Sequence, residues 1–228
     1  LINKTLSGLY SPGSTIKPLV ALSALENNII NPNLKVRCTG KTELYGQTFH
    51  CWKEKGHGLV SLKNAMKQSC DTYFYEVARL LGVDRLKITA EKFGLGEKVL
   101  GVYFENEKKG LFPNTDWKKN NLGKNWVLGE TLITGIGQGY TQTTPLQLCL
   151  MTAQIANGGY KIKPKIIVNN DPINVDLAKK SMEKQNLLNP DYKLVKENKN
   201  LRIVQEAMFS STNEIRGTSY KSRIDDPK

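Results

Sequence analysis

One apolar stretch near the start of the chain limits the possible folds more than any other feature. Between residues 16 and 25, Ile, Leu and Val recur at the three- and four-residue spacing of a helix with a buried face. Ser11-Pro12-Gly13 precedes the stretch, and Asn27-Asn28 follows it as a stop signal. Pro18 falls in the first turn, where its missing N–H group does little harm. We therefore predict a buried helix that begins near Ser14.

The rest of the chain combines further helical patterns with a few strands. Residues 34–60 are rich in strand and turn signals, and residues 160–168 alternate like a strand. Residues 101–128 are polar and interrupted by Gly and Pro, which predicts a long surface loop, and residues 169–198 predict a polar insertion. Further helices are expected over residues 61–67, 72–81, 84–93, 144–157 and 201–209. This mixture favours an α+β or α/β fold over an all-β fold.

Size and charge exclude some classes of protein. The 228 residues can bury a large core without a disulfide lattice, and no run of 18 apolar residues would span a membrane. The net charge of +12 is compatible with an anionic partner, but the lysines are scattered without interleaved aromatic residues. We interpret the charge as a composition bias and expect no nucleic-acid partner. The chain opens without Met, so we expect it to be a piece of a longer protein.

A candidate nucleophile lies at the start of the buried helix. Ser14-Thr15-Ile16-Lys17 fits the pattern S-x-x-K, in which positions three apart share one helical face. A desolvated lysine can remove the proton of a serine hydroxyl and so activate it for attack. Ser181-Met182-Glu183-Lys184 fits the same pattern, but it lies in a polar stretch that would not desolvate its lysine. The alternative for Ser14 is a serine that only caps the helix.

A second element raises the probability that Ser14 is catalytic. Ser69-Cys70-Asp71 lies in a break between two expected helices, as S-x-N or S-x-D does in enzymes that also contain S-x-x-K. The Ser69 hydroxyl can relay a proton to a leaving amine, and the Asp71 carboxylate can hydrogen-bond the lysine or a substrate amide. Ser211-Thr212-Asn213 is a second match, but its order and its place near the tail favour Ser69.

The motifs taken together resemble a known family. The chain contains Ser11-Pro12-Gly13-Ser14-Thr15-Ile16-Lys17-Pro18, then Gln68-Ser69-Cys70-Asp71-Thr72-Tyr73-Phe74-Tyr75, then Gly135-Ile136-Gly137-Gln138-Gly139 with Thr144-Pro145-Leu146-Gln147. In this order they resemble the transpeptidase domain of class B penicillin-binding proteins. The motif has an aspartate at Asp71 where most relatives have asparagine, and in this it resembles the penicillin-binding protein 2 subfamily, which acts in cell elongation. The resemblance implies an α+β fold of the penicillin-binding and serine beta-lactamase type, with an antiparallel sheet flanked by helices.

The resemblance also implies a function. It is that of a D,D-transpeptidase in which Ser14 is acylated by the D-Ala-D-Ala end of a peptidoglycan stem peptide, or by a beta-lactam. An acceptor amine then resolves the acyl-enzyme into a cross-link, with Lys17, Ser69 and Asp71 as the other catalytic residues and no cofactor for the chemistry. The implied partner is a glycosyltransferase of the elongation machinery. The implied location is the periplasmic face of the bacterial inner membrane, with an N-terminal anchor outside this chain.

One element of the family pattern is missing. The third motif, K-[ST]-G, does not occur, because Lys41-Thr42 is followed by Glu43 and Arg216-Gly217-Thr218 has the wrong order. The segment from Gly217 to Arg223 resembles what precedes this motif in relatives. We therefore expect residues 1–228 to be a partial transpeptidase domain. Alone it should be nearly inactive, because the missing strand would supply an oxyanion-hole N–H group.

Four cysteines raise the question of a metal. Cys38, Cys51, His57 and Cys70 have the ligand types of a tetrahedral zinc site, although their spacings are longer than those of a zinc finger. A Cys38–Cys51 disulfide and plain buried thiols are the alternatives. The resemblance favours a structural zinc, since penicillin-binding protein 2 relatives carry one in this region. His50 is the rival nitrogen ligand, but it should point to the opposite side of a strand. The fourth cysteine, at position 149, is expected on a buried helix face.

Other functions remain open at this point. The same Ser14 and Lys17 could serve a serine beta-lactamase or a D,D-carboxypeptidase, with water as acceptor. The segments around Gly137 and Thr144 argue against that reading. A different class of function is a non-catalytic penicillin-binding sensor, or a basic scaffold that binds anionic glycan.

Overall fold

The computed structural model describes residues 2–101, 104–164 and 192–224. The helices are α1 (Lys4–Ser7), α2 (Lys17–Glu26), α3 (Leu62–Lys67), α4 (Asp71–Leu81), α5 (Val83–Lys92), α6 (Thr115–Leu122), α7 (Leu128–Gly135), α8 (Pro145–Ala156) and α10 (Asn198–Asn213), with the 3-10 turns η1 (Gly13–Ile16) and η3 (Tyr220–Ser222). The strands are β1 (Lys35–Cys38), β2 (Lys41–Leu44), β3 (Gln47–His50) and β4 (Gly58–Ser61). Both classes of element are present, and the expected α+β class is confirmed. Within these residues no helix is both long and apolar enough to cross a bilayer.

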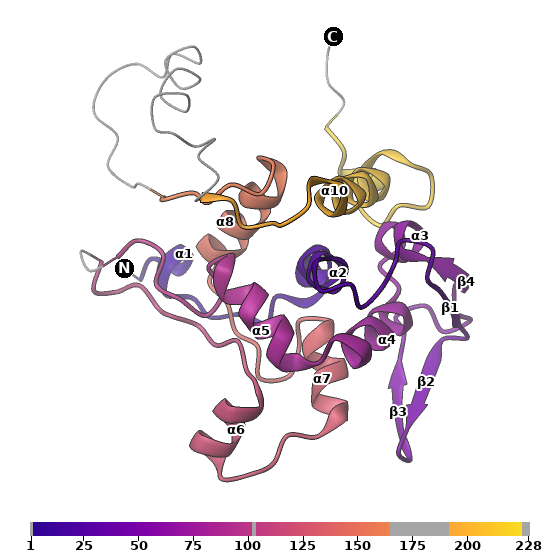
Figure 1. Cartoon of the computed structure of the whole chain (residues 1–228), viewed down its shortest axis with the longest axis horizontal. Helices are drawn as coiled ribbons and strands as arrows, with labels where there is room; N and C mark the ends of the chain where they lie inside the picture. Colours follow the sequence, from indigo (N-terminus) through magenta and orange to yellow (C-terminus); the bar gives the residue numbers. More distant parts are fainter. Residues whose placement is uncertain (1, 102–103, 165–191, 225–228) are drawn as a thin grey trace.

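Helix α2 lies at the centre of the molecule, as its apolar sequence predicts. It lies between α10 on one side and α4 and α5 on the other, and it contacts all three (Figure 1). Every residue from Leu19 to Leu25 is buried, and Leu19 and Leu22 are fully inaccessible to solvent. The helix continues directly from η1, so its first turn is tighter than a regular α-helix.

The strands form two small antiparallel sheets at one end of the molecule, next to α3 and α4 (Figure 1). In one sheet β1 pairs with β4, and Cys38 lies opposite Gly58. In the other β2 pairs with β3, and Lys41 lies opposite His50. These registers place the ends of β1 and β3 near one another, because the short turn at residues 39–40 connects the two sheets.

The prediction of a long loop at residues 101–128 is wrong in part, because this segment contains α6. This helix is mostly polar, and its stability comes from its ends and from one buried ion pair. The Asn114 side chain accepts from the Trp117 N–H group at 2.9 Å, and Gly123 closes the helix in the left-handed region. Lys118 is buried against Glu130, with 2.5 Å between Nζ and Oε1. None of these contacts produces the apolar periodicity that reveals a helix in a sequence.

Other boundaries also differ from expectation. Helix α7 was not predicted, since glycines at 129 and 135 obscure its apolar pattern. Helix α10 extends beyond the expected residues 201–209 at both ends. Of the expected strand at residues 160–168, Tyr160 forms a single bridge to Lys193, residues 161–164 form no strand, and the rest lies outside the described residues. The expected insertion at residues 169–198 is outside them up to residue 191.

Cys149 is exposed, which corrects the expectation that it lies on a buried face. The buried side of α8 instead consists of Gln147, Leu150, Met151, Gln154 and Ile155. Two of these are glutamines whose amides satisfy backbone carbonyls, such as Gln154 Nε2 to Phe93 O at 3.0 Å. A buried face that contains polar residues cannot be found from apolar spacing alone.

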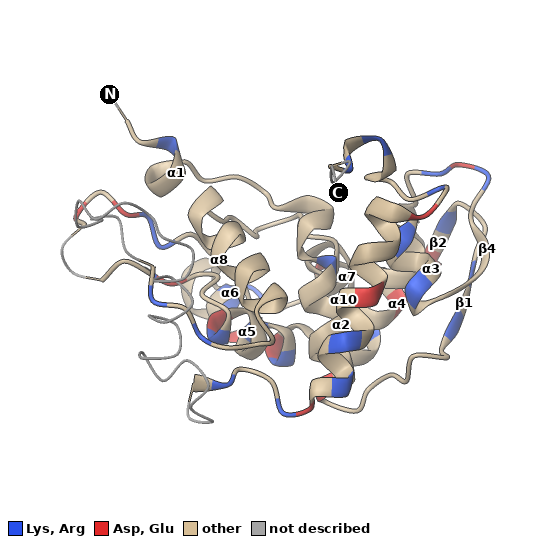
Figure 2. Cartoon of the chain, turned by 90° about the horizontal axis from the view of Figure 1, so that it is seen from above, with Lys and Arg blue, Asp and Glu red and all other residues tan. Residues whose placement is uncertain are grey.

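Charged residues are spread over the whole described surface. Figure 2 shows lysines and arginines on helices and strands from α1 to α10, with acidic residues among them. Several are paired on the surface, as Glu214 is with Lys63 and Lys67, each at 2.8 Å. The two lysines lower the pKa of the Glu214 carboxyl to about 2 through these hydrogen bonds.

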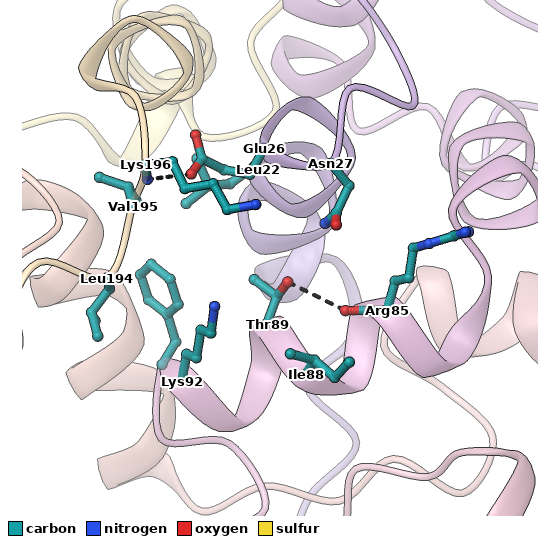
Figure 3. A pocket seen from close by; sticks show the side chains of 11 residues that line it. Leu22, Glu26, Asn27, Arg85, Ile88, Thr89, Lys92, Leu194, Val195 and Lys196 are labelled. Atoms are coloured by element: carbon teal, nitrogen blue, oxygen red, sulfur yellow. Dashed lines mark hydrogen bonds between the residues drawn. The ribbon is translucent and has the colours of Figure 1, made fainter.

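A small hollow between α2, α5 and the segment before α10 shows how α10 is fixed (Figure 3). Glu26, the last residue of α2, accepts hydrogen bonds from the backbone N–H groups of Lys196 and Glu197 and from Asn200 Nδ2, the last at 2.7 Å. A carboxylate at this position satisfies N–H groups that the start of α10 would leave free. The end of α2 therefore holds the start of α10.

Gly137 brings the glycine cluster against the start of α2. Its backbone φ is +72°, and a Cβ atom there would lie 2.3 Å from Gly13 O and 2.5 Å from Ile16 Cγ2. The Gly13 N–H group donates to Gly137 O at 2.9 Å. Any side chain at this position would push η1 away, so only glycine fits.

We predict that Gly137→Ala destabilises the protein by roughly 2–4 kcal/mol, the sum of left-handed strain and overpacking. Gly123→Ala is the matched control, because Gly123 also has positive φ but its Cβ would meet nothing within 4 Å. The control should cost only about 1 kcal/mol. Melting temperatures of the two variants measure the difference. Equal losses would show that the contact with Gly13 is not tight.

Candidate active site

Four polar residues from three separate segments meet at the start of α2. Lys17 Nζ lies 2.7 Å from Asp71 Oδ1 and 2.9 Å from Ser69 Oγ. Ser69 Oγ donates in turn to Ser14 Oγ at 3.0 Å. The structure thus brings together all four residues that the sequence analysis selected as catalytic.

Lys17 is the most buried member of this group, with 1% of its surface exposed. Its third acceptor is the backbone carbonyl of Ser69 at 2.9 Å, so three acceptors surround the three ammonium hydrogens. The Phe74 ring, with its centroid 5.4 Å from Nζ, adds a cation–π contact. A charge this buried is tolerable only with such partners, and they fix the amine in one position.

Ser14 and Lys17 are connected through Ser69. The expectation from S-x-x-K was a direct reach from amine to hydroxyl, but the hydrogen bonds in the described structure run from Lys17 to Ser69 and from Ser69 to Ser14. The three ammonium hydrogens of Lys17 already have acceptors on Ser69 and Asp71, so the connection to Ser14 runs through the Ser69 hydroxyl. A proton can pass between Ser14 and Lys17 through one intervening hydroxyl.

Ser69 has an unusual backbone conformation. Its φ is +52°, in the left-handed region that costs a non-glycine residue of order 1 kcal/mol or more. The expected break between the two helices is short, because Cys70 is extended and Asp71 already begins α4. The turn still directs the side chains of Ser69 and Asp71 toward Lys17 and that of Cys70 to the other side.

Ser14 itself is exposed, at the end of this otherwise buried network. It lies in η1, at the N-terminal end of α2, where the helix dipole creates positive potential. An exposed hydroxyl that is hydrogen-bonded toward a buried amine fits the requirements of a nucleophile in acyl transfer. The arrangement can therefore support attack on a carbonyl carbon.

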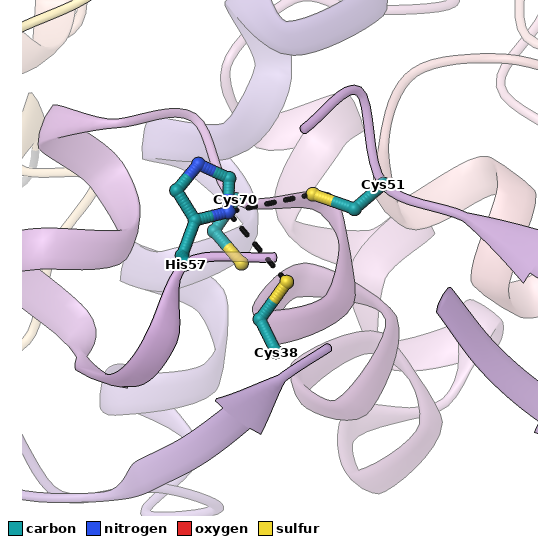
Figure 4. A group of neighbouring side chains, drawn as sticks. All are labelled: Cys38, Cys51, His57 and Cys70. Atoms are coloured by element: carbon teal, nitrogen blue, oxygen red, sulfur yellow. Dashed lines mark hydrogen bonds between the residues drawn. The ribbon is translucent and has the colours of Figure 1, made fainter. Parts of the chain in front are cut away.

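Behind Cys70 lies a compact cluster of three cysteines and one histidine. The ligand atoms of Cys38, Cys51, His57 and Cys70 all lie within 4.8 Å of one another (Figure 4). His57 Nδ1 is 3.6 Å from Cys38 Sγ and 3.5 Å from Cys51 Sγ. Tetrahedral zinc with Zn–S near 2.3 Å and Zn–N near 2.05 Å requires S···N separations of about 3.6 Å. The two S···N separations that involve His57 match this value.

The electrostatics of the thiols also fit a cation. A hydrogen bond from the Cys70 thiol lowers the pKa of Cys51, while the same hydrogen bond and burial raise the pKa of Cys70. Without a cation only one of the two is readily ionised, because a second buried thiolate would be repelled. All four cysteines are free thiols in this structure, so the alternative Cys38–Cys51 disulfide is not formed in it.

The surroundings of the cluster are tightly packed. A Cβ on Gly56 would lie 2.2 Å from Cys38 O, so the loop that carries His57 approaches the end of β1 closely. Cys38 Sγ contacts the Thr72 hydroxyl at 3.3 Å, and His57 Nε2 is buried without a hydrogen-bond partner in the described structure. His50, the rival ligand, is exposed and outside the cluster.

Only one of the two remaining serine motifs falls among the described residues. Ser181 is outside the described residues, and Ser211 Oγ is 3.2 Å from Thr218 Oγ1, near the end of α10. The sequence analysis missed two residues at the site. The only sequence signal for Phe74 was its apolar position at helical spacing, which indicates burial and not a role at the site. Trp52 lies inside the Cys51–Gly58 stretch, and nothing in the sequence pattern distinguishes it from its neighbours.

Comparison with known proteins identifies the family. A family model described as the penicillin binding protein transpeptidase domain matches residues 1–226. Peptidoglycan D,D-transpeptidase MrdA of Acinetobacter baumannii is 40% identical over 169 residues, which cover 73% of this chain and 25% of that protein.

Two solved structures of penicillin-binding protein 2 are similar over nearly the whole chain. That of Pseudomonas aeruginosa, in complex with WCK 5153, is 37% identical, has a TM-score of 0.81 and matches 96% of this chain and 48% of its own. That of Helicobacter pylori, in complex with MreC, is 33% identical, has a TM-score of 0.82 and matches 99% and 39%. The chain thus spans less than half the length of each of these three relatives. The expected fold is confirmed, and the protein belongs to the family of penicillin-binding protein transpeptidase domains.

Proposed function

We propose that residues 1–228 act within a peptidoglycan D,D-transpeptidase that cross-links the cell wall during elongation. The observation that carries this proposal is the hydrogen-bonded chain from buried Lys17 through Ser69 to exposed Ser14. The substrate is the D-Ala-D-Ala end of a stem peptide, and beta-lactams acylate the same serine. The similarity to MrdA and to penicillin-binding protein 2 supports this assignment.

In the acylation step, Ser14 Oγ attacks the carbonyl carbon of the penultimate D-Ala. For this step Lys17, an ammonium in the resting site, first releases one proton to solvent. The Ser14 proton then passes to Ser69, and Ser69 passes a proton to the neutral Lys17 amine. The C–N bond then breaks, and Ser69 gives a proton to the departing D-Ala amine while Lys17 returns a proton to Ser69. Asp71 keeps the Lys17 side chain in place. An acceptor amine reverses these proton transfers, and the acyl group moves from Ser14 to that amine.

We also propose a structural zinc held by Cys38, Cys51, His57 and Cys70. Zinc would neutralise the buried thiolates and supply no chemistry to the reaction, because a closed four-ligand site leaves no position for water. Cys70 lies between Ser69 and Asp71, so fixing its sulfur also fixes the two residues that contact Lys17. The metal would therefore hold the catalytic segment from behind.

The partners are proposed from one relative, and the location is proposed from the cell-wall function. The Helicobacter pylori relative was solved with MreC, which supports a place in a wall-elongation assembly. We propose a glycosyltransferase as a further partner and the periplasmic face of the inner membrane as the location. Because the relatives are longer than this chain, the experiments below use the full-length protein.

Ser14→Ala should abolish covalent labelling by a fluorescent penicillin and leave the melting temperature unchanged, because it removes only an exposed hydroxyl. Ser181→Ala, in the other S-x-x-K motif, should label normally. Peptide mapping of the labelled protein identifies the acylated residue. A label on any residue other than Ser14 would contradict the proposal.

Lys17→Arg should slow acylation by about 100- to 10,000-fold, the usual contribution of a general base. Guanidinium keeps the charge but does not lose its proton in proteins. Lys118→Arg is the matched control, since Lys118 is also buried and paired with a carboxylate. Stopped-flow acylation should separate the two variants. A near-normal rate in Lys17→Arg would reduce Lys17 to an electrostatic role.

His57→Ala or a strong chelator should remove one zinc per chain and lower the melting temperature by roughly 5–10 °C. Acylation should slow on the order of 100-fold, because a 1 Å displacement of catalytic groups costs about that much. His50→Ala, at an exposed histidine outside the cluster, is the control. Elemental analysis reports the metal independently of activity.

Two results would count against zinc as a clamp. If zinc is present but its removal changes neither stability nor acylation, the metal does not hold the catalytic segment. If no metal is found and Cys38 and Cys51 form a disulfide, the site itself does not exist.

A further inference from the structure

We propose that Trp52 is a positioning residue that holds the Ser69 segment in its catalytic conformation. Trp52 follows Cys51 in the loop between β3 and β4 and makes three kinds of contact, through its indole N–H, its backbone N–H and its ring. This inference rests on the proposed function, because it concerns how Ser69 and Asp71 are placed for the reaction at Ser14.

The indole N–H group reaches the backbone of the Ser69 turn. Trp52 Nε1 lies 3.0 Å from Ser69 O and 3.1 Å from Gln68 O. Ser69 O also accepts from Lys17 Nζ at 2.9 Å, so two donors hold the carbonyl of a residue with left-handed φ. Fixing this peptide fixes the direction of the Ser69 side chain, whose Oγ lies between Lys17 Nζ and Ser14 Oγ.

The backbone N–H group of Trp52 holds the other catalytic side chain. It donates to Asp71 Oδ2 at 2.9 Å, while Asp71 Oδ1 accepts from Lys17 Nζ at 2.7 Å. The carboxylate is thus held at both oxygens and cannot rotate without losing one of these bonds. One residue therefore contacts both Ser69 and Asp71 from outside the cluster.

The Trp52 ring lies against the proposed metal cluster. It packs edge-to-face on the His57 imidazole, with 5.4 Å between centroids and 67° between planes. Yet 59% of Trp52 is exposed, so core packing does not explain a tryptophan here. Tryptophan combines an aromatic ring with an N–H donor at its edge, so one side chain can pack on His57 and also donate to the Ser69 turn.

Trp52→Phe tests this role, because it keeps a ring against His57 and removes only the indole donor. In the full-length protein, the rate of acylation from the bound complex (k2) should fall about tenfold, equivalent to about 1.4 kcal/mol. The dissociation constant of the non-covalent complex (Ks) and the zinc content should stay unchanged. Stopped-flow kinetics with a chromogenic cephalosporin separate k2 from Ks.

Trp126→Phe is the matched control. Trp126 lies in the loop before α7, and its indole N–H group donates to Thr131 Oγ1 at 2.8 Å. The substitution therefore also removes one indole donor. Its k2 should remain at the wild-type value. Trp52→Leu, a second variant without the donor, should lose k2 at least as strongly as Trp52→Phe.

Hydrogen exchange measures positioning without any turnover. The amides of Ser69 and Cys70 donate to Met66 O and Ala65 O at 3.1 and 2.8 Å. Their exchange should become faster in Trp52→Phe and not in Trp126→Phe. If wild-type protein were not acylated at Ser14, the proposed function would fail, while the exchange data would still decide whether Trp52 holds the turn.

Three outcomes would overturn the inference. The first is an unchanged k2 together with unchanged exchange at Ser69 and Cys70. The second is a weaker Ks with normal k2, which would make the indole a ligand contact. The third is an equal loss of k2 in Trp126→Phe, which would indicate a general effect on the fold.

Discussion

The buried ammonium of Lys17 is the constraint to which the rest of the site adjusts. A charge with 1% exposure needs a partner at every hydrogen, and Lys17 takes its partners from Ser69 and Asp71, more than fifty positions away. Neither partner can move without leaving part of the charge unpaired, which costs several kcal/mol. The start of α2 and the start of α4 are therefore fixed relative to each other by one side chain, and exposed Ser14 is placed as a consequence.

The segment from Ser69 to Asp71 links this network to the cysteine cluster. Its outer residues face Lys17, and Cys70 between them faces Cys38, Cys51 and His57. A three-residue segment has few torsions to adjust, so a shift of the Cys70 sulfur moves the side chains of both Ser69 and Asp71. The cluster and the nucleophile are thus parts of one arrangement, although the cluster has no group that would contact the substrate's reacting bond.

The central helix and the candidate site could be predicted from the sequence, whereas some peripheral helices and the exposure of some residues could not. Helix α2 was predictable, because burial on most sides forces apolar residues at helical spacing. Ser14, Lys17, Ser69 and Asp71 were selected by motif, and the structure brings them together. Helix α6 was missed because it depends on the Asn114 cap and the Lys118–Glu130 pair, which are contacts that no periodicity reports. The exposure of Cys149 was misjudged because buried glutamines share the inner face of α8.

The left-handed conformation of Ser69 closes helix α3, because the Ser69 N–H group donates to Met66 O and the Cys70 N–H group donates to Ala65 O, as in a Schellman cap. Glycine is the usual residue at such a cap and a serine there costs of order 1–3 kcal/mol, so the residue type does not indicate this turn. Two donors on its carbonyl, from Lys17 and Trp52, contribute about 1 kcal/mol or more each, the charged one more than the neutral one. The strain is thus offset by the two hydrogen bonds of the α3 cap and by contacts from two other parts of the chain. Since these contacts fix the Ser69 peptide as well as stabilise it, the Ser69 hydroxyl stays between Lys17 and Ser14, where a proton relay requires it.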